Sequence, residues 1–271
     1  MILFIFLSSF VFGTIIGSFL NVVALRYKTG KNLSGRSMCF SCGTGLKWFE
    51  LIPILSFVFQ KGKCRTCRSP FSAQYPAVEA LTGLVFAITT TFFYFLPIEA
   101  SLVLLPFFLL CFSILIVIAI YDIRHMIIPD MLVFLFAFLG LLFMVLTNSP
   151  EYLLTFPGIL DLFAGPILAL PFALLWALSR GQWMGFGDAK LALGIGWLLG
   201  LSSGLSALAL GMWIGAFWSI AKMATAKMKH KKKKVLTMKS EIPLAPFLIL
   251  ATFIQFIFAF DFFQLNVLLS L

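Results

Sequence analysis

Charged side chains and histidines are scarce in this sequence. Only 11% of the 271 residues are charged, and the two histidines are His125 and His230. A soluble domain carries about 25% charged residues, so a chain with 61% apolar residues needs a bilayer as part of its solvent. The sequence contains no His-Glu-x-x-His motif. This absence excludes the zinc-protease site that the motif builds.

The formal charge of +10 fits either nucleic-acid binding or membrane topology. We favour topology and expect no nucleic-acid partner, because Lys and Arg stay on the cytoplasmic side of membrane proteins. Apolar runs then predict an all-α polytopic membrane protein with about eight transmembrane helices. The runs lie at about 2–24, 78–97, 101–121, 130–147, 157–178, 188–203, 205–222 and 243–262.

The distribution of basic residues predicts the orientation of these helices. Arg26 and Lys28 follow the first span, which places the N-terminus outside and the next loop in the cytoplasm. No basic region precedes the first apolar run, so we expect an uncleaved span and not a signal peptide. The run 231–234 is four lysines, which either fix the topology or contact anionic headgroups. The predicted parts are a first helix over 1–24, a cytoplasmic insert over 25–77 and a seven-helix membrane domain over 78–271.

Four of the five cysteines form two Cys-x-x-Cys pairs in the insert, Cys39 with Cys42 and Cys64 with Cys67. Two such pairs supply the four thiolates of a closed, structural zinc site. Free cytosolic thiols are the alternative, and disulfides are not expected in the cytoplasm. We interpret Cys111, in the middle of a predicted helix, as a small core residue.

Two aspartates stand where predicted spans meet the cytoplasmic face. Asp122 ends one span, where the helix dipole disfavours negative charge, so it suits a carboxyl that carries a proton. Asp188 opens a later span, where it ionises more readily or simply caps the helix. Asp130 also opens a span and has the same capping explanation. Membrane-embedded carboxylates are costly and usually functional.

Two carboxyls brought close together share a proton, so one can act as a base toward water while the other acts as an acid toward a carbonyl oxygen. Gly185 and Gly187 precede Asp188 and leave room for an extended peptide. Glycines also recur at a spacing of four, at Gly13 and Gly17 and at Gly211 and Gly215, which predicts close helix packing. We found no internal repeat and no phosphate-binding glycine loop.

The ordered set of motifs resembles the bacterial type IV prepilin peptidases, which are bifunctional leader peptidases and N-methyltransferases of the GxGD aspartic protease group. The matching segments are 17–23 (GSFLNVV), 46–53 (LKWFELIP), 62–65 (GKCR), 75–79 (YPAVE), 122–130 (Asp122 to Pro129-Asp130), 184–191 (MGFGDAKL) and 242–247 (IPLAPF). The first cysteine pair, Trp183 and Leu244-Ala245 depart from the usual pattern, and none of these departures touches the aspartates.

The resemblance implies a catalytic pair, Asp122 and Asp188, supported by Gly185, Gly187 and Lys190. It implies cleavage of type IV prepilins or pseudopilins after a glycine, at the cytoplasmic face of the inner membrane. The new N-terminal residue would then be methylated with S-adenosylmethionine, and the resemblance associates Glu50 and Glu79 with that step. The domain over 78–271 is then the peptidase domain.

Two other functions use the same residues. In a proton-coupled transporter, Asp122 and Asp188 would carry protons, but such carriers lie near the midplane and not at one face. A catalytically inactive assembly factor would only bind pilins. The sequence does not specify the pathway served (pilus, type II secretion or DNA uptake) or the oligomeric state.

Overall fold

The computed structural model describes residues 1–29, 35–228 and 243–263, and the described part consists of helices, turns and loops without strands. The lysine run 231–234 lies outside the described residues. The chain forms two compact units, Met1–Val117 and Ile118–Leu271. Each unit is described by itself. The division at residues 24 and 77 stays a prediction.

The first unit is built on α1 (Ile2–Arg26) and α3 (Gln74–Tyr94), which pack closely along their glycines. A Cβ atom at Gly13 would lie 2.7 Å from the Phe86 Cβ, and one at Gly17 would lie 2.9 Å from the Glu79 Cα. No side chain fits at such distances, so these glycines let the two helices touch. The predicted packing role of Gly13 and Gly17 is confirmed.

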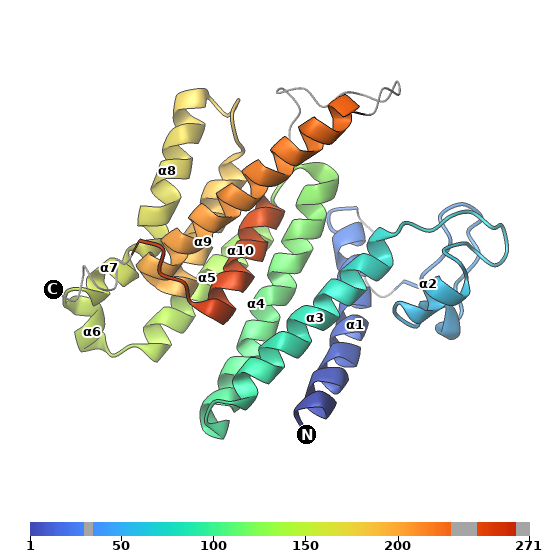
Figure 1. The fold of residues 1–271 in the computed structure, drawn as a ribbon, viewed down its shortest axis with the longest axis horizontal. Helices are drawn as coiled ribbons and strands as arrows, with labels where there is room; N and C mark the ends of the chain where they lie inside the picture. Colours follow the sequence, from blue (N-terminus) through green and yellow to red (C-terminus); the bar gives the residue numbers. More distant parts are fainter. Residues whose placement is uncertain (30–34, 229–242, 264–271) are drawn as a thin grey trace. The chain divides into compact units, whose positions relative to one another are not determined.

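The insert between these helices contains the 3-10 turn η1 (Trp48–Leu51) and the short helix α2 (Leu55–Phe59). Figure 1 shows α2 beside α1 and α3. The chain enters α2 through Ile54, whose φ of 61° is unusual for a β-branched residue. The Glu79 Oε2 accepts a hydrogen bond of 2.7 Å from the Ile54 N–H. Glu79 of α3 therefore holds the start of α2 in place.

The helix α4 (Ile98–His125) begins in the first unit and ends in the second. In the first unit the Phe108 ring lies 5.6 Å from the Phe93 ring of α3, and the Ser101 hydroxyl donates to the Phe93 carbonyl at 2.8 Å. Cys111 is completely buried, which confirms it as a core residue.

The second unit contains the end of α4 and six further helices. These are α5 (Asp130–Thr147), α6 (Pro150–Leu154), α7 (Gly158–Leu162), α8 (Ala164–Ser179), α9 (Phe186–Met228) and α10 (Ala245–Phe258). The predicted span 157–178 is interrupted at Phe163. Pro166 explains the break, because a proline ring clashes with the carbonyl four residues earlier and would not allow one continuous helix.

The long helix α9 is two arms that reverse direction at Gly200, where φ is 79° and ψ is −179°. A Cβ atom at Gly204 would lie 3.4 Å from the Gly196 Cα, a distance possible only if the chain folds back on itself. The Asp161 Oδ1 accepts the Leu201 N–H at 2.9 Å and so caps the second arm. The two predicted spans 188–203 and 205–222 are these two arms (Figure 1).

Small residues let the first arm of α9 pack against α5 and α8. A Cβ atom at Gly194 would lie 2.5 Å from the Phe136 ring of α5, and one at Gly196 would lie 2.6 Å from the Ala164 carbonyl of α8. The second arm packs on α10, where a Cβ atom at Gly211 would lie 2.8 Å from a Leu248 methyl. The glycines therefore fix the core of this unit.

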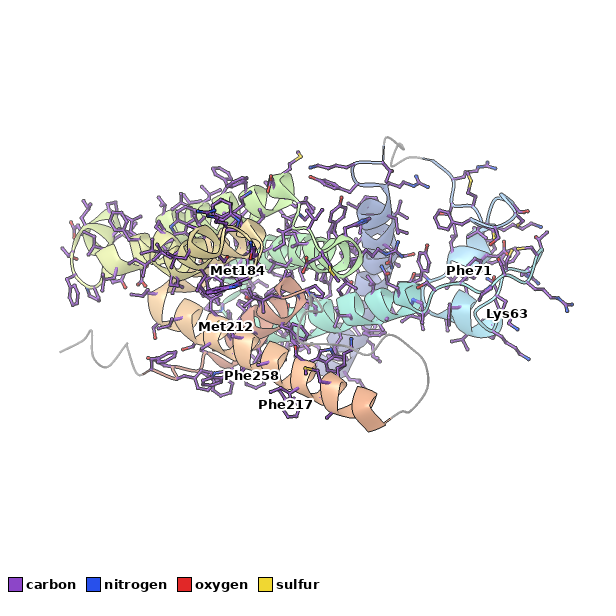
Figure 2. The ribbon with its side chains drawn as sticks, turned by 90° about the horizontal axis from the view of Figure 1, so that it is seen from above. Lys63, Phe71, Met184, Met212, Phe217 and Phe258 are labelled. Atoms are coloured by element: carbon purple, nitrogen blue, oxygen red, sulfur yellow. The ribbon has the colours of Figure 1, made fainter. Side chains whose placement is uncertain are left out.

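Five of the described helices are long and apolar enough to cross a membrane by length and composition: α1, α3, α4, α5 and α9. The apolar helices α8 and α10 are shorter. Large side chains such as Met212, Phe217 and Phe258 point away from the helices in Figure 2, and each is at least 45% exposed. With both arms of α9, these helices give the predicted all-α multi-pass membrane protein.

Candidate active site and metal site

The Asp122 carboxyl lies near the end of α4 and is 5% exposed. It accepts a hydrogen bond from the backbone N–H of Ala245, the first residue of α10. Pro243 and Pro246 have no N–H, and the Phe247 N–H donates to the Leu244 carbonyl at 3.0 Å. The α10 start thus directs the Ala245 N–H, with the positive end of the helix dipole, at Asp122. The motif at 242–247 was recognised in the sequence, but no role was predicted for Ala245.

Asp188 is the third residue of α9 and is 8% exposed. The helix begins at Phe186, so Asp188 is not its N-cap, and the capping explanation is wrong. Its backbone N–H instead donates to the Gly185 carbonyl at 3.3 Å. A carboxyl in a first helical turn is favoured by the helix dipole.

The structure brings the two predicted carboxyls together within the second unit. The charge of Asp122 acts directly on Asp188. Both side chains are almost completely buried in the protein. Two buried carboxyls within electrostatic reach cannot both ionise easily, and they titrate as a pair.

The two glycines before Asp188 differ in their surroundings. A Cβ atom at Gly187 would lie 2.7 Å from the Ile128 Cβ, whereas one at Gly185 would meet nothing closer than the Gly187 nitrogen at 3.9 Å. Gly187 therefore lets the α9 start close onto the segment before α5. Only Gly185 has the open space that sequence analysis predicted for both glycines.

Lys190 connects the starts of α9 and α5. Its Nζ lies 2.6 Å from the Asp130 Oδ1 and 5.1 Å from the centre of the Phe186 ring. Asp130 was predicted to cap α5, but Pro129 occupies the N-cap position and Asp130 is the first helical residue. The capping interpretation is wrong, and the ion pair with Lys190 is the observed contact.

The thiols of Cys39, Cys42, Cys64 and Cys67 all lie within 4.8 Å of one another. The Cys39 and Cys67 sulfurs are 3.8 Å apart, and none of the cysteines forms a disulfide. Four sulfurs placed tetrahedrally at about 2.3 Å from a Zn²⁺ ion are about 3.8 Å from one another. The four cysteines are positioned to hold a metal ion.

The two cysteine pairs sit in equivalent turns, which we call the first knuckle (38–45) and the second knuckle (63–70). Each turn is closed by hydrogen bonds at matching positions, from the Cys39 N–H to the Thr44 carbonyl and from the Cys64 N–H to the Ser69 carbonyl. The residue after each pair has a positive φ, 69° at Gly43 and 58° at Arg68. This local repeat was not recognised in the sequence.

Hydrogen bonds in the two knuckles favour the thiolate form of two cysteines, Cys39 and Cys67. The Ser69 hydroxyl, together with the N–H groups of Cys42 and Ser41, lowers the pKa of Cys39 to about 6. The pKa of Cys67 is also lowered, with the Ser69 hydroxyl again the main cause. The thiolate is the form that ligates metal ions.

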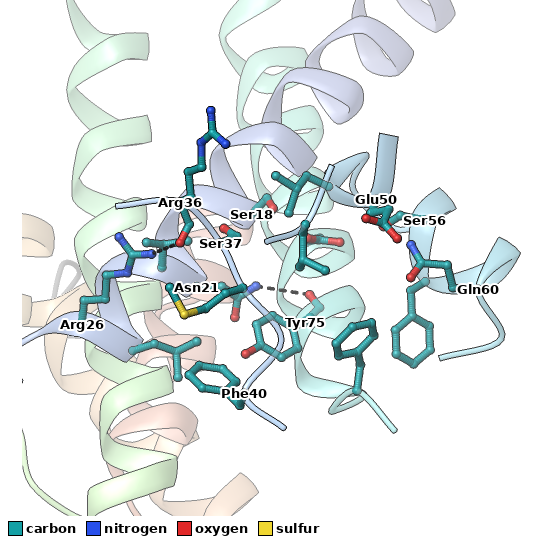
Figure 3. Close-up of a pocket in the computed structure, with 18 of the residues that line it drawn as sticks. Ser18, Asn21, Arg26, Arg36, Ser37, Phe40, Glu50, Ser56, Gln60 and Tyr75 are labelled. Atoms are coloured by element: carbon teal, nitrogen blue, oxygen red, sulfur yellow. Dashed lines mark hydrogen bonds between the residues drawn. The ribbon is translucent and has the colours of Figure 1, made fainter. Parts of the chain in front are cut away.

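A cavity of about 240 Å³ lies in the first unit and is lined by both predicted methyltransferase residues, Glu50 and Glu79. Figure 3 shows Glu50 in the cavity wall. The Glu50 Oε2 accepts the Lys47 N–H at 2.8 Å, and Glu79 is 7% exposed. Among the described residues, the Asn21 Oδ1 and the Gln60 Oε1 on this cavity have no hydrogen-bond partner. The cavity wall thus presents oxygen acceptors to a ligand that donates hydrogen bonds.

Comparison with known proteins gives two family matches along the chain. Residues 11–93 match the bacterial Peptidase A24 N-terminal domain, and residues 109–220 match the type IV leader peptidase family. No match was found among solved structures.

Several curated relatives share one name, prepilin leader peptidase/N-methyltransferase. The relative from Bacillus subtilis is 34% identical over 225 residues, covering 82% of this chain and 85% of that protein. The relative from Aeromonas hydrophila is 29% identical over 278 aligned positions, covering 90% of this chain and 88% of that protein. The chain therefore belongs to the prepilin leader peptidase/N-methyltransferase family, as its sequence motifs predicted.

Proposed function

We propose that this chain is a membrane aspartic endopeptidase that removes the short leaders of type IV prepilins or pseudopilins, and that it also methylates the new N-terminus. The observation that carries the peptidase proposal is the buried pair Asp122 and Asp188 in the second unit. The family resemblance supplies the substrate class and cleavage after a glycine.

The pair shares one proton in the resting enzyme. The ionised carboxyl takes a proton from a water molecule, and the water oxygen attacks the carbonyl carbon of the scissile peptide bond. The protonated carboxyl gives its proton to the carbonyl oxygen. When the tetrahedral intermediate collapses, the C–N bond breaks and a proton passes to the leaving amine.

Asp122 was predicted to be the proton holder because it lies at the end of α4, where the helix dipole disfavours negative charge. The Ala245 N–H stabilises negative charge on that same carboxyl and so opposes the α4 dipole. We therefore assign the acid and base roles to the two carboxyls jointly, and we give neither residue a fixed role.

A prepilin processing assay in proteoliposomes tests the peptidase proposal. Asp122→Asn and Asp188→Asn should each lower the cleavage rate by about 10²–10⁴-fold, because each removes one acid–base group. Asp161→Asn is the matched control, since its amide oxygen can still cap Leu201. Full processing by either catalytic variant would refute the mechanism, and no processing by the wild type would favour a transporter or an inactive assembly factor.

The cavity of the first unit is the candidate site for methylation. S-adenosylmethionine would supply an electrophilic methyl group there. Orphaned acceptors on Asn21 and Gln60, with the carboxyls of Glu50 and Glu79, suit a ligand that carries cationic and N–H groups. A substrate amine must lose a proton before it can attack a methyl group, and Glu50 and Glu79 are the carboxyls that line this cavity.

Glu50→Gln and Glu79→Gln test this assignment, because each keeps a hydrogen-bond acceptor and removes the base. Mass spectrometry of the processed pilin should show cleaved, unmethylated N-termini in at least one variant. Normal methylation by the double variant would refute the role of these glutamates.

We propose Zn²⁺ as the ion of the four-cysteine site, held in a structural role. The closed set of four sulfurs supports zinc, because such a set leaves no open position for chemistry. Metal analysis of the purified protein tests this assignment, and a protein without bound zinc would contradict it.

We further propose an inner-membrane location with the N-terminus outside and the aspartate pair facing the cytoplasm. Arg26 at the end of α1 and the basic residues of the insert support this orientation. Accessibility of added cysteines to an impermeant thiol reagent, in cells and in inverted vesicles, measures it.

A further inference from the structure

The short helix α2 exposes an apolar face that no described part of the chain covers. Leu55, Val58 and Phe59 are 53%, 62% and 81% exposed, and their spacing puts them on one side of the helix. Trp48 of the adjoining η1 is 78% exposed. We call Leu55, Val58 and Phe59 the α2 face. Phe57, on the same helix, instead lines the cavity.

The contacts of α2 show how far it lies from the ends of the neighbouring helices α1 and α3. The cavity that α2 closes with Ser56, Phe57 and Gln60 reaches Ser18 of α1 and Glu79 of α3. Ser18 is about 12 Å from the α1 end at Arg26, and Glu79 is about 7.5 Å from the α3 start at Gln74, at 1.5 Å per residue. The helix α2 thus lies beside the spans and not beyond their ends (Figure 1).

Two features hold α2 at that depth. The Glu79 carboxylate accepts the Ile54 N–H at 2.7 Å, which ties the helix start to α3. The strained turn at Ile54, closed by a hydrogen bond from the Leu55 N–H to the Pro53 carbonyl, redirects the chain into α2. Strain of this kind persists only where surrounding structure holds it.

The charge of the insert complements an anionic surface. Residues 35–73 contain one acidic residue, Glu50, and six basic residues: Arg36, Lys47, Lys61, Lys63, Arg65 and Arg68. Each basic residue near an anionic leaflet contributes on the order of 1 kcal/mol. Lys61 and Lys63 follow α2 directly, and both are exposed.

We propose that the α2 face is embedded in the bilayer interface, on the side from which the insert emerges. The apolar side chains enter the headgroup and acyl boundary, and the flanking lysines bind anionic headgroups. Amphipathic helices at such an interface bury their apolar face by about 5–10 Å, which is of the same order as the distances of α2 from the ends of α1 and α3. The insert is then a peripheral membrane element as well as a metal-binding one.

Photo-crosslinking tests the proposal on the full chain in nanodiscs of phosphatidylcholine and phosphatidylglycerol. Benzoylphenylalanine is placed at Val58 or Phe59, and at Thr66 as an exposed control in the second knuckle. Mass spectrometry should find lipid adducts at Val58 and Phe59 in about tenfold excess over Thr66. Equal lipid labelling at all three positions, or none at any, would overturn the proposal.

A crosslink from Phe59 to another protein, with no lipid adduct, would also overturn it and would identify the face as a protein interface. A second variant keeps a negative result interpretable. Phe59→Asp should reduce lipid labelling at Val58 severalfold, because it places a charge in the apolar face. Phe59 is exposed, so an unchanged thermal midpoint would show that the fold is retained.

Discussion

The four-cysteine site and the aspartate pair are assembled in opposite ways. The cysteines lie in two local turns closed by their own backbone hydrogen bonds, with 21 residues between the pairs. The aspartates depend on three helices, because Asp122 ends α4, Asp188 begins α9, and Ala245 of α10 donates to Asp122. The first arrangement is built from local turns that contact each other through Cys39 and Ser69, whereas the second needs the packing of a whole unit.

Removing a metal ligand should give the largest difference between the two sites, because it should affect metal binding and not cleavage. Cys64→Ser should abolish zinc binding, since structural four-ligand sites contribute roughly 10–16 kcal/mol of apparent binding free energy. Prepilin cleavage should persist, because the aspartates belong to the other unit. Metal analysis and the processing assay measure both effects, with Cys111→Ser as the control, and complete loss of cleavage would break the separation.

Adding a side chain at Gly187, next to Asp188, should give the next largest effect on the cleavage rate. Gly187→Ala should lower cleavage about 10²-fold, because a methyl group 2.7 Å from the Ile128 Cβ displaces Asp188. Gly185→Ala is the control and should leave the Asp188 position unchanged. Adding Ile128→Gly to Gly187→Ala should restore part of the rate, whereas adding Ile128→Ala should not, because alanine keeps the clashing Cβ.

The reversal of α9 offers a test of stability within the second unit. Asp161→Ala should destabilise the protein by about 1–3 kcal/mol, because the Leu201 N–H and the Tyr152 hydroxyl lose their acceptor. Unfolding in detergent measures the change. Asp161→Asn should cost clearly less, and equal losses for both variants would mean that the charge and not the cap matters.

The smallest expected effect is a change in the stability of the insert when the residue after a cysteine pair is substituted. Arg68→Gly should stabilise the insert by about 0.5–1 kcal/mol, because Arg68 has a φ of 58° where Gly43 occupies the matching position. Gly43→Ala should destabilise it by a similar amount. Competition with a zinc chelator measures both, and opposite signs are the expected result.

Sequence patterns predicted what depends on composition and local spacing. Apolar runs predicted the spans. They included both arms of α9, because the sequence is apolar on each side of the reversal at Gly200. The cysteine spacing placed four thiols within 4.8 Å. The catalytic assignment of Asp122 and Asp188 came from the ordered motifs around them, because either aspartate alone could also be explained as a helix cap.

Tertiary contacts were not predictable in the same way. The Lys190 to Asp130 ion pair joins residues 60 positions apart, so the position of Asp130 at a helix start suggested only a cap. Gly185 and Gly187 have equivalent sequence neighbourhoods, and only the approach of Ile128 distinguishes them. The place of α2 beside α1 and α3 depends on the hydrogen bond to Glu79, which no local pattern encodes.

The hydrogen bond between Ala245 and Asp122 has a consequence for biosynthesis. The donor follows the carboxylate by 123 residues, so a ribosome adding about 5–20 residues per second makes it roughly 6–25 s later. Until α10 is inserted, the Asp122 carboxylate lacks this backbone donor. The aspartate pair that we propose as catalytic is therefore complete only after α10 has entered the membrane, so we expect cleavage activity to appear late in the synthesis of the chain.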